Sequence, residues 1–142
     1  MSIKENDCIK LFGDAEELVT YKNGGGPYYA LTKRILDRYL FLQLSIKFRQ
    51  DAGMLVGDPE DLEFMVVKEI GETLERMKAS DIPALVKQEM VLHASYCSAE
   101  MSNLTEYEKA EKLGMSQSMY FRLKRTGIRN VAWLLFINKE LP

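Results

Sequence analysis

Apolar residues recur every three or four positions through most of this chain, which is the period of an amphipathic α-helix. The longest such pattern predicts a helix from Pro27 to about Gln50, and its principal stripe consists of Leu31, Ile35, Leu42 and Ile46. Four more apolar residues widen the stripe: Leu36, Leu40, Leu44 and Phe48. Because so broad an apolar surface is unfavourable in water, we expect it to be buried on more than one side.

Two further helices are predicted in the middle of the chain. The first spans about 59–78, and its stripe consists of Leu62, Val66, Ile70, Leu74 and Met77. Asp58 and Pro59 mark its start, because aspartate caps a helix N-terminus and proline fits the first helical position. Pro83 opens the next helix, whose apolar residues are Leu85, Val86, Met90, Leu92 and Tyr96. No segment alternates between apolar and polar residues for long enough to predict a strand.

The first 26 residues have a weaker pattern. Residues 7–21 show a helical period that Gly13 interrupts, and they predict a short or broken helix. Three glycines then precede Pro27, and this run predicts a hinge, because glycine loses much backbone entropy in a helix. The run lacks the lysine and the hydroxyl of a nucleotide-binding loop, so we favour a turn over a phosphate site.

The last third of the chain has the pattern of a helix-turn-helix. Thr105 and Glu108 have capping-box spacing and predict a helix start. Ala110 stands four residues before Gly114, where a small side chain lets two helices approach and a glycine ends the first of them. A second helix follows, and we expect it to end at Gly127. The predicted fold is a compact all-α domain of about five to seven helices with a C-terminal helix-turn-helix.

The register of this segment sorts its side chains into two faces. Four residues are expected to face the interior: Leu113, Met115, Tyr120 and Leu123. Six are expected to face outward: Ser116, Gln117, Ser118, Phe121, Arg122 and Arg125. The basic residues from 117 to 130 are Arg122, Lys124, Arg125 and Arg129, and no acidic residue lies among them. The outward set is typical of a helix that reads DNA, and the basic side chains suit contacts with phosphates.

Three regions are expected to form one cooperative domain: an N-terminal helix and glycine hinge (1–26), a helical core (27–103) and the helix-turn-helix segment (104–142). Charge is unevenly distributed along the chain. Residues 1–50 carry a net charge of +2, residues 51–103 carry −7 and residues 104–142 carry +3. An acidic middle with basic ends permits nucleic-acid binding through the ends. Solvated helix faces are the simpler explanation of the acidic middle.

Length and composition indicate one ordinary domain, or a domain with a small appendage, and we expect the protein to be cytoplasmic. A chain of 142 residues with 46% hydrophobic content is long enough to bury a core and is not wholly disordered. No apolar run approaches the roughly 18 residues of a membrane span, and the N-terminus lacks the layout of a signal peptide. Cys8 and Cys97 are too few and too isolated for a disulfide framework or a zinc site, and no cofactor is expected. His93 lies four residues before Cys97, but no orienting group accompanies the pair, so we do not predict an enzyme.

The C-terminal third resembles the helix-turn-helix of sigma-factor region 4 and, more closely, that of lambdoid phage antitermination proteins of the Q type. Three segments carry the resemblance: 91–96 (VLHASY), 110–116 (AEKLGMS) and 120–123 (YFRL). It covers about 50 of the 142 residues and leaves 1–80 unmatched. Lys109 departs from the pattern, because these motifs usually carry an aliphatic residue before the alanine.

These observations predict a DNA-binding transcription regulator of phage or prophage type. Gln117, Ser118 and Arg122 would meet base edges in the major groove of double-stranded DNA. Lys124, Arg125 and Arg129 would hold phosphates. The resemblance further implies antitermination together with RNA polymerase or its sigma factor. We expect the apolar tail from Val131 to Ile137 to pack back on the domain or on a second subunit. A homo-oligomer contact of this kind supports the alternative function, a helical oligomerisation or adaptor protein such as a small terminase subunit.

Overall fold

The computed structural model describes Cys8, residues 28–54 and residues 61–137. In this part of the chain there are five α-helices and one π-helical turn, and there is no strand. The elements are α3 (Tyr29–Asp51), α4 (Leu62–Lys78), α5 (Pro83–Leu92), the π-helical turn η1 (His93–Cys97), α6 (Glu106–Lys112) and α7 (Gln117–Phe136). The predicted all-α fold class is confirmed. The glycine run and all of the predicted 7–21 helix except Cys8 lie outside the described residues.

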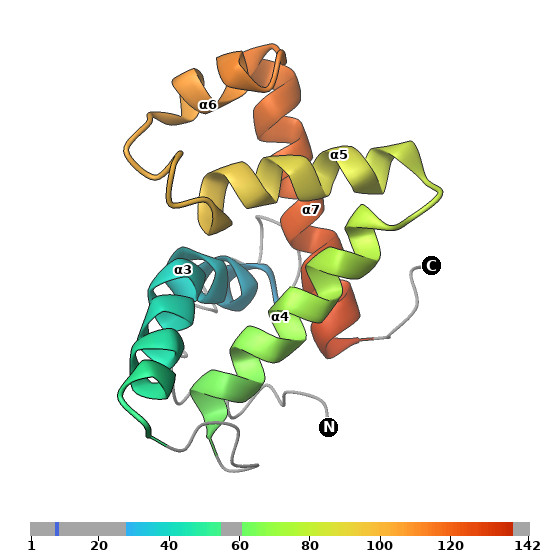
Figure 1. The fold of residues 1–142 in the computed structure, drawn as a ribbon. Coiled ribbons are helices and arrows are strands. Elements are labelled where there is room, and N and C mark those ends of the chain that lie inside the picture. Colours follow the sequence, from blue (N-terminus) through green and yellow to red (C-terminus); the bar gives the residue numbers. More distant parts are fainter. Residues whose placement is uncertain (1–7, 9–27, 55–60, 138–142) are drawn as a thin grey trace.

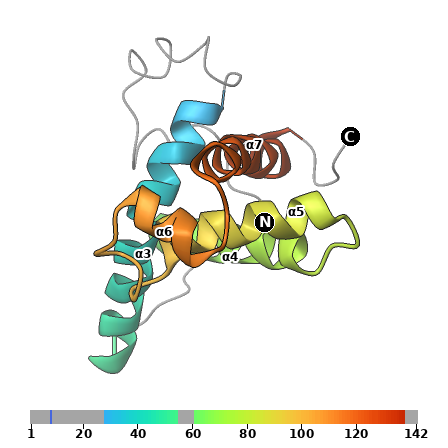
Figure 2. The ribbon, with the colours of Figure 1, turned by 90° about the horizontal axis from the view of Figure 1, so that it is seen from above.

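The long helix α7 runs behind the other elements and connects them. In Figure 1, α5 and α4 cross in front of α7, while α6 lies at its N-terminal end. Figure 2 views the molecule along α7 and shows the first half of α3 beside it. Helices α3, α4 and α5 all contact α7. The helix therefore belongs both to the main body and to the α6 end of the molecule.

The main core lies between α3, α4, α5 and the second half of α7. The predicted stripes supply it: Leu31, Ile35, Leu36, Leu42, Val66, Ile70, Leu74, Met77, Leu85 and Leu92 are all buried in one cluster. From α7 the cluster takes Ile128, Val131, Leu134 and Leu135. The apolar tail of the sequence thus packs back on its own domain. Ile137, at the end of this tail, is half exposed.

One part of the predicted core of α3 is exposed. Leu44 and Phe48 were expected to be buried, but their exposed fractions are 56% and 73%. Phe41, on the same side of the helix, is 71% exposed. Figure 2 shows the reason, because the second half of α3 extends past the other helices. A broad apolar pattern on one helix does not ensure that the fold provides neighbours for all of it.

Helix α4 begins three residues later than its sequence suggests. The predicted start at Asp58 and Pro59 lies outside the described residues, and the helix begins at Leu62. Asp61 is the capping residue, since its Oδ1 accepts from the Phe64 backbone N–H at 3.1 Å. Its other oxygen, Oδ2, accepts from Arg49 Nη1 at 3.2 Å. One carboxylate therefore caps α4 and ties it to the end of α3.

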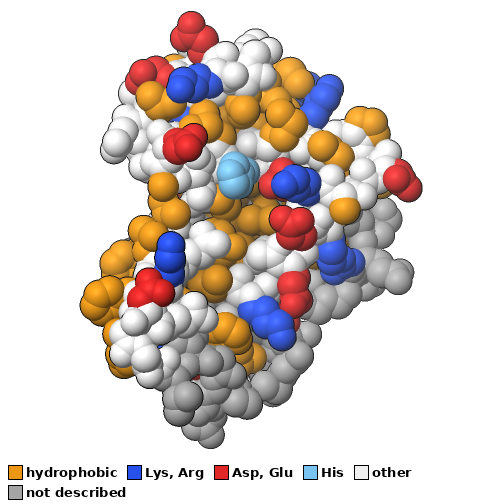
Figure 3. Space-filling model, in the orientation of Figure 1, with side chains coloured by type: hydrophobic (Ala, Val, Ile, Leu, Met, Phe, Trp, Pro, Cys, Tyr) orange, Lys and Arg blue, Asp and Glu red, His pale blue; other side chains and the backbone are white. Residues whose placement is uncertain are grey.

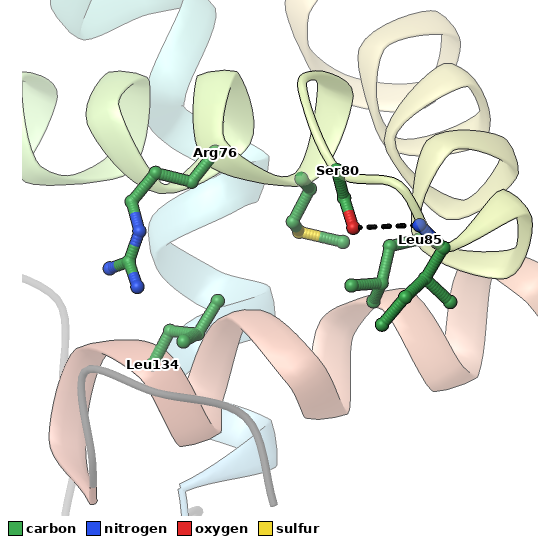
Figure 4. A pocket seen from close by; sticks show the side chains of 6 residues that line it. Arg76, Ser80, Leu85 and Leu134 are labelled. Carbon is green, nitrogen blue, oxygen red and sulfur yellow. Dashed lines mark hydrogen bonds between the residues drawn. The ribbon is translucent and has the colours of Figure 1, made fainter.

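Ser80 and Pro83 shape the connection between α4 and α5. Ser80 Oγ accepts from the Ile82 backbone N–H at 3.1 Å, and Pro83 occupies the first turn of α5. Figure 4 shows this bond beside a pocket of about 220 Å³ whose walls come from α4, α5 and α7. Ser80, Ile82 and Leu85 in its lining place the pocket at the N-terminal end of α5.

Gly127 does not end the second helix of the C-terminal segment. Helix α7 continues through it to Phe136, so the prediction that the helix ends at Gly127 is wrong. A Cβ atom at this position would lie 3.1 Å from Leu92 Cδ1 and 3.3 Å from Gln88 Cβ. Nearby, Asn130 Nδ2 donates to Gln88 Oε1 at 2.6 Å. The glycine lets α5 and α7 cross closely, and this packing outweighs its poor helix propensity.

None of the described helices is long and apolar enough to cross a membrane.

Replacing Gly127 by valine should lower the free energy of unfolding by about 2 kcal/mol, because the added methyl groups would overpack the crossing with Leu92. Urea unfolding followed by circular dichroism measures the change. The control is Ser118→Val, which adds the same side chain to an exposed position of α7. Equal stabilities of the two variants would contradict a packing role for Gly127.

Candidate nucleic-acid interface

Helix α6 starts at the predicted capping box. The Thr105 hydroxyl accepts from the Glu108 backbone N–H at 3.2 Å, and Glu108 Oε1 accepts from the Thr105 backbone N–H at 3.1 Å. These reciprocal bonds satisfy two backbone donors that a helix start would otherwise leave unpaired. The local sequence therefore sets where α6 begins.

The turn after α6 is a Schellman motif. Gly114 has a φ of +70°, in the left-handed region that favours glycine. The Met115 N–H donates to the Ala110 carbonyl and the Gly114 N–H to the Glu111 carbonyl, each at 3.0 Å. Ser116 then caps α7, its hydroxyl accepting from the Met119 N–H at 3.2 Å. The bonds close α6 and start α7 within four residues.

Side chains of α6 and the first half of α7 pack in a second, smaller cluster. Its buried members are Val91, Ala110, Tyr120 and Leu123, and Leu113 and Met115 pack against them. The four residues predicted to face inward therefore do so. Ala110 is only 1% exposed, which explains why a small side chain is needed there. Val91 comes from α5, so this cluster rests directly on the main body.

The opposite side of α7 is polar and exposed. Of the predicted contact residues, Ser116, Gln117, Ser118, Arg122, Arg125 and Arg129 are exposed. Ser118, Arg122, Arg125 and Arg129 succeed one another at helical spacing, so they lie on one face. That face extends for about 16 Å along the helix axis, at 1.5 Å per residue. Helix α7 contains no acidic residue.

The structure places two predicted contact residues elsewhere. Phe121 is half-buried in the small cluster, with its ring edge-on to Tyr107 and Tyr120 at centroid distances of 5.9 and 5.5 Å. Lys124 Nζ lies 3.1 Å from Glu106 Oε2 and 5.1 Å from the centre of the Tyr96 ring. Both side chains therefore serve internal packing. The contact residues that remain on the exposed face are the six others.

Glu106 is the centre of a polar network that sequence reasoning did not anticipate. Its Oε2 accepts from the Tyr120 hydroxyl at 2.9 Å, from the Ser95 hydroxyl at 3.0 Å and from Lys124 Nζ at 3.1 Å. Its Oε1 accepts from Lys109 Nζ at 3.1 Å. We call these five side chains the Glu106 network. It joins η1, α6 and α7 at the base of the exposed face.

Lys109 completes this network from an unusual position. The side chain is only 5% exposed, and its Nζ also reaches the Ser95 carbonyl at 3.4 Å. A buried lysine is stable only with partners, and Glu106 supplies the opposite charge. The departure of Lys109 from the aliphatic pattern was thus the sequence signal for the network. Glu106 and Lys109 are three residues apart on one helix, and this spacing could have predicted their ion pair.

The network controls the ionisation of Glu106. Burial by itself would raise the pKa of this carboxyl, but hydrogen bonds from Tyr120 and Lys109 and the charge of Lys124 outweigh it and lower the pKa to about 2. Burial raises the pKa of Tyr120, which keeps its hydroxyl protonated as a donor. Glu106 is therefore a carboxylate at neutral pH and holds both lysines.

His93 and Cys97 lie at another surface. Both line a pocket between α3, α4 and the end of α5, where His93 is exposed and Cys97 is half-buried. Burial, with a contribution from Glu89, raises the pKa of the Cys97 thiol to about 12. Such a thiol carries very little thiolate at neutral pH, and thiolate is the nucleophilic form. A raised pKa of this kind disfavours the nucleophilic form of Cys97.

No family model, curated protein or solved structure matches the chain. The resemblance to sigma-factor region 4 and to Q-type antitermination proteins therefore stays a prediction from the motif.

Glu106→Gln should lower the free energy of unfolding at pH 7 by about 2 kcal/mol, because it leaves Lys109 and Lys124 without an opposite charge. Since the pKa of Glu106 falls from 4.5 to about 2 on folding, its contribution is present above pH 4.5 and is lost as the pH falls towards 2. As the pH falls from 4.5 towards 2, the free energy of unfolding of Glu106→Gln should therefore decrease less than that of the parent protein.

Urea unfolding at several pH values between 7 and 2 measures both effects. The matched control is Glu111→Gln, which removes an exposed carboxylate from the same helix. If this control destabilised the protein as much as Glu106→Gln, the network would have no special role.

Proposed function

We propose that this chain is a sequence-specific DNA-binding transcription regulator that inserts the first half of α7 into the major groove. The observation that carries the proposal is the exposed face of α7, which is basic and free of acidic residues on a chain of net charge −2. Phosphate contacts need such a local concentration of positive charge. In this proposal α6 and α7 act as a helix-turn-helix.

The start of α7 suits base recognition. Gln117 and Ser118 occupy the first two positions of the helix and are exposed, and Arg122 follows one turn later. In helix-turn-helix proteins the N-terminal residues of the second helix contact base edges. Glutamine can pair with adenine and arginine with guanine in the major groove. Ser116 lies at the same end of the helix.

The part of the exposed face of α7 that follows Arg122 suits contacts with the DNA backbone. Arg125 and Arg129 are exposed one and two turns beyond Arg122, where a helix leaving the groove would pass the phosphates. Lys124 does not join them, because Glu106 holds its ammonium group. We therefore assign Lys124 to positioning α7, and we assign phosphate contacts to the two arginines.

A reading helix must be held firmly, and the contacts around α7 provide this. Tyr120 is fully buried and hydrogen-bonded to Glu106, while Gly127 brings α7 against α5. Side chains locked by packing and hydrogen bonds present a fixed pattern to a ligand. The DNA-contacting residues thus project from a helix anchored at two points.

The finer assignment is antitermination with RNA polymerase or its sigma factor, as the resemblance implies. It is supported by the segments 91–96, 110–116 and 120–123. The acidic middle of the chain, with a net charge of −7 over residues 51–103, is the candidate surface for the polymerase. An acidic surface repels DNA and attracts a basic protein surface.

A second candidate function is oligomerisation, as in an adaptor or a small terminase subunit. Its support is the exposed apolar stripe of α3, which we define as Phe41, Leu44 and Phe48. Apolar side chains gather over α3 in Figure 3. If two copies of α3 pair antiparallel about Leu44, Phe41 of one copy meets Phe48 of the other. Such self-complementarity is what a two-fold interface requires.

DNA binding should weaken as salt rises, and Arg122→Ala combined with Arg125→Ala should reduce both the affinity and this salt dependence. If each arginine neutralises one phosphate, the slope of log K against log salt should fall by about 2. Fluorescence anisotropy with a duplex of mixed sequence at two or more salt concentrations measures both quantities.

The matched control removes two exposed lysines from α4 and α5, Lys68→Ala with Lys87→Ala. It changes the net charge equally and should leave binding nearly unchanged. The absence of binding by the parent chain at low salt would refute the proposal. Equal binding by the arginine variant would move the contact to another basic surface, such as Lys33, Arg34 and Arg38 on α3.

For self-association, Phe41→Ser combined with Phe48→Ser should convert an oligomer into a monomer, because it removes most of the apolar contact area. Sedimentation velocity over a range of concentrations measures the oligomeric state. Ile82→Ser with Met90→Ser is the control, since these apolar side chains are also exposed but lie on or beside α5. A parent chain that stays monomeric at every concentration would exclude this role for the stripe.

A further inference from the structure

A pocket of about 280 Å³ lies between α3, α4 and the junction of α5 with η1, on the face shown in Figure 3. His93, the pale-blue side chain in that view, stands at its rim. The pocket does not belong to the α6 and α7 surface. Its walls combine apolar groups, including Leu74 and Gly71, with polar side chains from all of the surrounding elements.

Glu89 is the unusual member of this pocket. The residue is only 8% exposed, yet its carboxyl makes no hydrogen bond or ion pair with any residue that the structure describes. Burial raises the pKa of Glu89, and the nearby charges of His93 and Lys78 only partly oppose this. Its oxygens are not among the fully buried side-chain atoms of the described residues that lack a hydrogen bond, so the carboxyl is open to the pocket. A partly desolvated carboxylate gains from pairing with a positive charge.

The other side chains of the pocket indicate which kind of ligand could pair with the Glu89 carboxyl. Glu75 adds a second acidic side chain to the lining beside Glu89. Tyr39 Oη accepts from Gln43 Nε2 at 3.1 Å and keeps its own hydrogen for another acceptor. The charge of the lining is therefore negative. Its volume and apolar walls suit a small organic group better than a bare ion.

We propose that this pocket binds an organic cation, an alkylammonium or alkylguanidinium group whose charge pairs with the Glu89 carboxylate. Leu74 and the backbone at Gly71 would contact the alkyl part. The glycine keeps this wall open, since a Cβ there would lie 3.3 Å from Tyr39 Oη. The same chemistry is found in a free small amine and in a lysine or arginine side chain of another protein. This site is independent of DNA binding.

The test is a titration of the ¹⁵N-labelled chain with three probes, followed by amide chemical shifts in NMR. Two probes are free cations, n-butylammonium and ethylguanidinium, and the third is a short flexible peptide with one lysine. We expect saturable shifts centred on Gly71, Glu89 and Cys97. Glu89→Gln, which has nearly the same shape, should weaken binding about tenfold through the loss of one charge-assisted contact.

Glu111→Gln is the control, because it removes an exposed carboxylate far along the chain in α6. It should bind within about twofold of the parent, as expected for a surface charge. Saturation by the free cations would identify a small-molecule site, and saturation by the peptide alone would identify a side-chain site. Shifts that do not saturate with any probe, or binding that is unchanged in a folded Glu89→Gln variant, would overturn the proposal.

Discussion

The carboxylate of Glu106 is the interaction on which the C-terminal part of this structure depends. It accepts from Ser95, Tyr120, Lys109 and Lys124, and these side chains come from three elements that local sequence alone would leave independent. Helix α6 has only seven residues, too few for a stable helix in isolation. The capping box starts it and the Schellman turn ends it, but the charged network holds it against η1 and α7. The orientation of the exposed face of α7 follows from this attachment.

Helix α7 connects the α6 end of the molecule to the main body. Its first half packs in the small cluster around Tyr120, and its second half contributes Val131, Leu134 and Leu135 to the main core. At the crossing with α5, between the two halves, stands Gly127. Because one continuous helix belongs to both clusters, the proposed DNA-contacting segment is not a separate domain joined by a linker. A rigid connection of this kind would couple the recognition of DNA to whatever the main body binds.

Two other surfaces, the apolar stripe of α3 and the Glu89 pocket, lie on different elements and suit different ligands. The apolar stripe of α3 is largely exposed, and it suits a second copy of the chain. The Glu89 pocket is small, negatively charged and partly apolar, and it suits an organic cation. Neither surface overlaps the exposed face of α7.

Four features follow from local sequence: the α6 capping box, the turn at Gly114, the inward set around Tyr120 and the charge of α7. Such features depend on residues within one or two turns of each other, so periodicity and turn chemistry identify them. Long-range packing, in contrast, explains why Lys124 and Phe121 turn inward, why α7 continues through Gly127 and why Phe48 is exposed. These outcomes depend on neighbours distant in sequence. A pattern along one helix specifies which side is apolar or charged, but not which other element will lie against it.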